Sequence, residues 1–77
     1  MPGNAPMRSL HSPRYRHFVR RLRQARQEAR LTQVEAARAL GRPQSFVAKI
    51  ESGQRRVDVI ELQDLAKLYR KQLTYFL

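Results

Sequence analysis

The fold is decided by residues 32–53, which have the sequence TQVEAARALGRPQSFVAKIESG. Thr32 followed three residues later by Glu35 forms a capping box, the pattern that begins a helix. Gly41 suits the left-handed position at which a helix ends, and only two residues separate it from the next helical pattern. We therefore predict two short helices joined at a sharp angle, the second of them over residues 44–52.

The inner faces of these two helices are marked by small and apolar residues. In the first helix Ala36, Ala37 and Leu40 share one face. In the second helix Val47 and Ile50 are one turn apart and face the same way. The alanines allow the close approach that a sharp crossing of two helices requires.

Helices are also predicted on both sides of this pair. Ser12 and Pro13 suit the start of a first helix, in which apolar residues then recur at three- and four-residue spacing. Asp58 can cap a fourth helix over residues 59–70. The chain ends with four large apolar residues that we expect to form a short helical turn, namely Leu73, Tyr75, Phe76 and Leu77.

The pattern as a whole predicts an all-α fold, a compact bundle of four to five helices containing a helix-turn-helix. Seventy-seven residues are enough for one domain and too few for two, and we place this domain at residues 13–77. Residues 1–12 are rich in Pro, Gly, Asn and Ser and carry little apolar surface, so we expect a disordered tail there.

The charge of the chain points to a polyanionic partner. Sixteen basic and six acidic residues give a net charge of +10 and a pI near 11.5. This balance favours nucleic acid over a membrane surface. A basic amphipathic first helix could also lie on an anionic membrane, but its apolar stripe has no Trp and includes two alanines. We expect no membrane partner; the alternative to a nucleic acid is a basic surface that only aids solubility.

Several other functions are disfavoured by the composition. The chain has no cysteine, and His11 and His17 have no nearby acidic residues, so we expect neither a metal nor another cofactor. No Ser, His and Asp set or Gly-rich phosphate loop occurs at a recognisable spacing, so we do not expect an enzyme. No apolar run reaches the roughly 20 residues of a membrane span. We expect a soluble protein of the bacterial cytoplasm, or one encoded by a phage, that joins the nucleoid when bound to DNA.

A set of motifs keeps a characteristic spacing: Thr32-Gln33, Ala37, Gly41, Gln44-Ser45-Phe46-Val47, Lys49-Ile50-Glu51, Gly53, Glu61-Leu62, Leu65-Ala66 and Leu68-Tyr69. In these motifs the chain resembles the phage Cro and repressor type of helix-turn-helix domain, the lambda-repressor-like XRE family. The resemblance covers residues 20–77 and implies a five-helix bundle that binds operator DNA, usually as a dimer. Arg30 departs from the family pattern, since a small residue often ends the first helix there. Pro43 stands where a Ser or Thr cap is common.

The candidate base-reading residues lie on the third helix. Gln44, Ser45, Ala48 and Lys49 point away from its apolar face. Gln can bond adenine N6 and N7 together, Lys can reach guanine O6 and N7, and Ser can bond either type of base. The resemblance implies that Gln44 and Ser45 begin the reading surface. Phe46 has two interpretations, contact with a thymine methyl group or the sugar edge, and burial in the core.

Backbone contacts would hold such a helix in register on DNA. The N-terminus of the second helix offers unpaired N–H groups and the positive end of the helix dipole. The resemblance implies that Gln33 contacts a phosphate and braces Gln44. The turn Arg55-Arg56 would clamp the other flank, unless it is simply solvated. The expected backbone contacts are Thr32, Gln33, Arg42, Ser52, Gln54, Arg55 and Arg56.

The resemblance also implies a partly buried ion pair between Arg26 in the first helix and Glu51 at the end of the third. A paired Glu51 would not repel DNA, because its charge is matched. The alternative is a Glu51 side chain that faces solvent.

We predict a transcriptional regulator, in the first place a repressor, that binds a palindromic operator as a homodimer. The dimer interface is expected at Leu73, Tyr75, Phe76 and Leu77, unless Leu73 and Phe76 only close the core of the monomer. One alternative is an antitoxin-type or partner-regulated repressor that also holds a second protein, such as a toxin or a protease. Another is a domain whose basic face binds RNA or an acidic protein.

Overall fold

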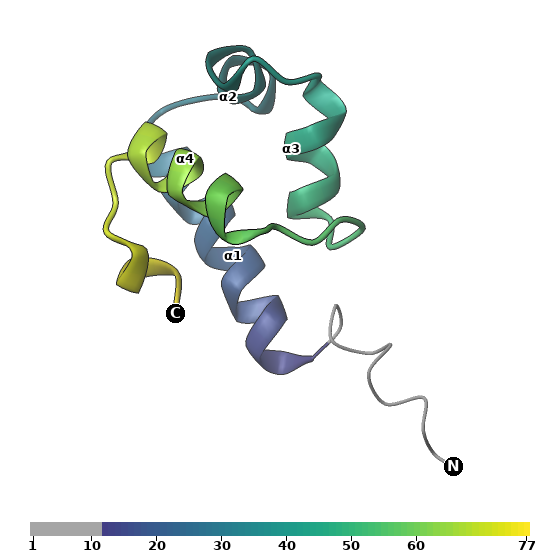
Figure 1. Ribbon diagram of the computed structural model, residues 1–77, viewed down its shortest axis with the longest axis vertical. Helices are drawn as coiled ribbons and strands as arrows, with labels where there is room; N and C mark the ends of the chain where they lie inside the picture. The colour runs from purple at the N-terminus through teal and green to yellow at the C-terminus, as the bar shows by residue number, and fades with distance from the viewer. Residues whose placement is uncertain (1–11) are drawn as a thin grey trace.

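The computed structural model describes residues 12–77, which form four α-helices and one 3-10 turn (Figure 1). No strand occurs between these residues, so the predicted all-α fold is confirmed. None of the described helices is long and apolar enough to span a membrane. The predicted tail lies outside the described residues except for Ser12. The elements are α1 (Pro13–Glu28), α2 (Gln33–Leu40), α3 (Gln44–Glu51), α4 (Val59–Tyr69) and the 3-10 turn η2 (Leu73–Phe76).

Three helices begin at caps that the sequence predicted. The Ser12 hydroxyl accepts a backbone N–H one turn into α1, at 3.1 Å. At the start of α2 the Thr32 hydroxyl accepts the Glu35 N–H at 3.0 Å, and the Glu35 carboxylate accepts the Thr32 N–H at 2.9 Å. Asp58 and Glu61 make the same reciprocal pair at the start of α4. These caps satisfy backbone N–H groups that have no partner inside the helix.

The helix ends use the left-handed backbone conformation. Gly41 and Gly53 have φ values of 69° and 81°, as the sequence predicted. Arg30 and Arg70 adopt the same conformation with φ of 62° and 60°, which is unfavourable for a residue with a Cβ atom. The third and fourth helices each end one residue earlier than predicted, because Ser52 and Arg70 are C-caps.

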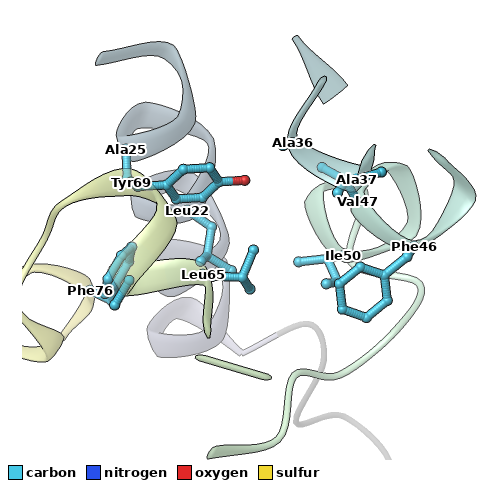
Figure 2. Close-up of a cluster of buried hydrophobic side chains, with 11 residues drawn as sticks. Leu22, Ala25, Ala36, Ala37, Phe46, Val47, Ile50, Leu65, Tyr69 and Phe76 are labelled. Carbon is cyan, nitrogen blue, oxygen red and sulfur yellow. The ribbon is translucent and has the colours of Figure 1, made fainter. Parts of the chain in front are cut away.

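The core joins the helix-turn-helix pair to the rest of the domain. Side chains from α1, α4 and η2 meet those of α2 and α3 (Figure 2). Leu40, which was predicted to face inward, is partly buried and packs against this core, as does Leu62. Its buried members are Leu22, Ala25, Ala36, Ala37, Phe46, Val47, Ile50, Leu65, Ala66, Tyr69 and Phe76.

The C-terminal segment contributes to the monomer core, which corrects part of the predicted dimer interface. Phe76 is 0% exposed, and its ring lies edge-on to those of Phe18 and Tyr75. It therefore closes the core of its own chain and offers no surface to a partner. Leu73 and Leu77 remain 40% and 78% exposed.

Candidate nucleic-acid interface

Helix α3 has one anchored face and one exposed face. Val47 and Ile50 are buried against the core, which fixes the rotation of the helix about its axis. Gln44, Ser45 and Lys49 are exposed on the opposite side. The half-buried Ala48 lies among them and leaves room for close approach of a ligand. A short helix with such an exposed polar face has the dimensions to enter a DNA major groove, which is about 12 Å wide.

Phe46 belongs to the core rather than to the exposed face of α3. It is only 7% exposed. Two guanidinium groups cover its ring, with the Cζ atoms of Arg42 and Arg55 at 4.4 and 4.8 Å from the ring centroid. This geometry selects burial from the two interpretations of Phe46 and removes it from the candidate base-reading residues.

At the start of α2 the two polar side chains, of Thr32 and Gln33, both make hydrogen bonds within the protein. The Thr32 hydroxyl is engaged in the capping box. The Gln33 amide Nε2 donates to Glu51 Oε1 at 3.1 Å. The resemblance implied that Gln33 braces Gln44 at the beginning of α3. In the structure Gln33 instead braces Glu51 at the end of this helix.

Glu51 lies in an ion pair with Arg26. Arg26 Nε donates to Oε2 at 2.7 Å and Nη2 donates to Oε1 at 3.0 Å, while Nη1 donates to the Leu31 carbonyl. Arg23 lies 3.5 Å from the same carboxylate. Burial raises the pKa of Glu51, but the hydrogen bonds from Arg26 and Gln33 outweigh it and leave the pKa below its ordinary value. Glu51 therefore carries a negative charge, which the neighbouring positive charges of Arg26 and Arg23 balance.

The segment after α3 carries the remaining candidate backbone contacts. The Ser52 hydroxyl donates to the Lys49 carbonyl at 3.1 Å. Gln54 and Arg56 are exposed, and the Arg56 guanidinium lies 5.3 Å from the Tyr15 ring centroid. Arg55 is not simply solvated, because it is bound to a carboxylate on α4.

That carboxylate is Glu61, a residue that sequence reasoning did not place in the site. Arg55 donates to both its oxygens, at 2.8 and 2.9 Å, and Arg42 Nη2 lies 3.4 Å away. The hydrogen bonds from Arg55 lower the pKa of Glu61 to about 2, although burial opposes this shift. The spacing of Asp58 and Glu61 is the only sequence signal for it, since it matches a second capping box.

These features define a class of protein, the helix-turn-helix DNA-binding proteins. The sequence model described as a helix-turn-helix domain matches residues 17–72. The chain is similar in structure to an XRE-family like protein from Pseudomonas syringae pv. tomato str. DC3000, with a TM-score of 0.80 and 40% sequence identity. The match covers 96% of this chain and 89% of that one.

The chain belongs to the XRE family of helix-turn-helix domains, and it is a DNA-binding regulator. None of the curated proteins compared with it matches. Residues 12–77 hold no group of three side chains that could bind a metal ion.

Proposed function

We propose that the protein is a sequence-specific transcriptional regulator, acting as a repressor, in which α3 reads the major groove of a palindromic operator. The observation that carries this proposal is the exposed polar face of α3 opposite its buried face. Gln44, Ser45 and Lys49 lie on a helix whose rotation is fixed by the core. A fixed rotation is what base reading requires, because hydrogen bonds to base edges depend on direction.

The residue types on this face suit base recognition. Gln44 can accept from N6 and donate to N7 of one adenine, and Lys49 can donate to O6 and N7 of a guanine. Ser45 can donate to or accept from either type of base. Ala48 brings the helix close to the base edges, since its side chain is a single methyl group.

Contacts to the DNA backbone would fix the register of α3. The exposed Gln54 and Arg56 follow α3, and Arg42 precedes it. The N-terminus of α2 would present the backbone N–H of Gln33 to a phosphate, since the Thr32 N–H is already bonded to Glu35. Such contacts position the protein and carry no base preference of their own.

A palindromic operator calls for two copies of the chain. Two reading helices about 34 Å apart meet successive major grooves on one face of B-DNA. We propose a homodimer whose interface includes the exposed Leu73 and Leu77, because exposed apolar side chains close together in the chain are typical of an interface.

Selection of binding sites from random duplex DNA tests the proposal. We expect an enriched inverted repeat and an affinity that falls steeply with salt, with a slope of about 0.9 per phosphate contact. Single-stranded RNA should compete poorly for the protein. Placing the selected repeat over a promoter should lower transcription when the protein is present. Failure to enrich any sequence, or a flat salt response, would overturn sequence-specific binding.

A further inference from the structure

We propose that Glu61 is a positioning residue of the DNA interface, which fixes Arg42 and Arg55 against Phe46 and so sets how the first turn of α3 meets DNA. This inference rests on the proposed function and assigns part of its sequence specificity to a residue on α4, outside the helix-turn-helix. Glu61 itself is not expected to touch a base.

The contacts of Glu61 use both carboxylate oxygens. Oε1 accepts from Arg55 Nη1 at 2.8 Å and from the Asp58 backbone N–H at 3.1 Å. Oε2 accepts from Arg55 Nη2 at 2.9 Å and lies 3.4 Å from Arg42 Nη2. The side chain is only 9% exposed. A bidentate pair with a guanidinium is the most directional ion pair that a carboxylate makes.

The two arginines come from the two connections that flank α3. Arg42 lies in the turn between α2 and α3, and Arg55 lies in the loop between α3 and α4. Both guanidinium groups contact the ring of Phe46, the third residue of α3. A single carboxylate, that of Glu61, thus connects the segments on both sides of α3 to α4. The ring that the two arginines contact is two residues along α3 from Gln44.

The charge of Glu61 is what makes this arrangement stable. Two guanidinium groups beside one aromatic ring repel each other, and a carboxylate between them offsets that repulsion. The side chains of Arg42 and Arg55 are 42% and 38% exposed, so both remain accessible to a phosphate. Their two positive charges exceed the single negative charge of Glu61, so the three residues together are positively charged. The two arginines are held in one geometry instead of sampling many rotamers, so a phosphate contact loses less side-chain entropy.

Electrostatics alone predicts the opposite effect of Glu61 on DNA binding. Glu61 is an acidic residue beside a surface that binds a polyanion, so removal of its charge would be expected to tighten DNA binding. If Glu61 positions the arginines and α3, its removal weakens binding to the operator while binding to unrelated DNA stays the same or tightens. The ratio of the two affinities separates the two effects.

The test compares Glu61→Gln with the wild-type chain on a selected operator duplex and on a scrambled duplex. The Gln side chain can still accept the Asp58 N–H, so the start of α4 is kept. We expect the operator-to-scrambled ratio to fall about tenfold, the discrimination of one base contact. The matched control is Glu28→Gln, which removes the same charge and also frees a cation, Lys71, held at 2.6 Å. Since Glu28 touches neither α3 nor its flanking turns in the contacts described, its variant should keep the wild-type ratio.

A second variant covers the case in which Glu61→Gln does not fold, as judged by circular dichroism. Glu61→Asp keeps the charge but is one methylene shorter, so it cannot reach Arg55 and Arg42 together, and it should show the same loss of ratio. A folded Glu61→Gln, or failing that a Glu61→Asp, with the wild-type ratio would overturn the inference. A wild-type chain that binds both duplexes equally would instead overturn the proposed function.

Discussion

At the scale of single residues, the ion pair of Arg26 and Glu51 makes the strongest prediction about stability. The Glu51 side chain is 2% exposed and that of Arg26 is 12% exposed. Removal of one partner leaves the other charge poorly solvated. We expect Glu51→Ala to lower the free energy of unfolding by about 3–5 kcal/mol, measured by chemical denaturation. Glu28→Ala, which removes an exposed carboxylate, should cost much less.

A double-mutant cycle isolates the pair from the rest of the core. Arg26→Ala combined with Glu51→Ala should cost less than the sum of the two single changes, since neither charge is then left alone. Strict additivity would mean that the two side chains are adjacent without stabilising each other.

The proposed base reader and the proposed backbone contact should behave differently on DNA. Gln44→Ala should cost about 1–3 kcal/mol of binding at one base pair and relax the preference at that position. Arg56→Ala should weaken binding to all sequences alike and reduce the salt slope by about one. Binding titrations on an operator and on its single-base variants measure both. Identical behaviour of the two variants would be incompatible with α3 as the reading helix.

For the residues around α3, the sequence predicted exposure but not every contact between distant side chains. The exposure of Gln44, Ser45 and Lys49 follows from helical periodicity and was predicted. The contact between Gln33 and Glu51 was not, because it joins side chains 18 positions apart and depends on the angle between two helices. Phe46 stayed open for the same reason, since its cover comes from two loops.

At the scale of helices, Arg30 offers a stabilising substitution. Its φ of 62° costs a residue with a Cβ atom free energy that glycine does not lose. Arg30→Gly should raise the free energy of unfolding by about 0.5–1 kcal/mol after the greater freedom of glycine in the unfolded chain is counted. Arg38→Gly, inside α2, removes the same charge and should destabilise by about 1 kcal/mol. Thermal melting of both variants measures the contrast, and destabilisation by Arg30→Gly would show that its side chain packs favourably.

The start of α4 should make stability depend on pH in the acid range. The pKa of Glu61 is about 2 in the folded chain against an ordinary 4.5, so folding favours its charged form. The stability that Glu61 contributes is present in full above pH 4.5 and is lost as the pH falls toward 2. Denaturation curves across this range should show a smaller loss for Glu61→Gln than for the wild-type chain. An equal loss in both would assign the acid sensitivity to other carboxylates, Glu51 first, whose pKa is also lowered.

Helix boundaries were the part of the fold that the sequence predicted most fully. Caps act over three or four residues. The helix boundaries at Ser12, Thr32, Gly41 and Asp58 can therefore be identified without knowledge of the tertiary structure. The left-handed Arg70 could not be found in this way, because an arginine normally continues a helix.

At the scale of the whole molecule, the burial of the C-terminal side chains depends on the path by which the chain folds back onto α1. The apolar residues of the last segment were predicted to form a partner interface, with the alternative that Leu73 and Phe76 only close the core of the monomer. In the structure η2 returns to α1, where Arg21 Nε donates to the Tyr75 carbonyl at 2.7 Å and Phe76 is buried beside Phe18. Composition indicates that a segment is apolar but not which of its side chains meet their own core.

The last prediction concerns dimer formation through the side chains that remain exposed. Leu73 and Leu77 are exposed apolar residues that precede and follow the buried Phe76 in the sequence. A chain shortened at Lys71 would lose Phe76 and test folding rather than association. We therefore choose Leu73→Ser with Leu77→Ser, which leaves Phe76 and the Arg21 contact in place.

Sedimentation at tens of micromolar should show a dimer for the wild-type chain and a monomer for the double variant. The Val34→Ser chain is a control, since it removes another exposed apolar side chain, on α2. Circular dichroism must show all three folded. On DNA the double variant should bind an isolated half-site as the wild type does and lose affinity for the full palindrome, because the second subunit no longer adds its contacts. A wild-type chain that stays monomeric, both free and on a half-site, would remove Leu73 and Leu77 from any interface and leave cooperativity to the DNA alone.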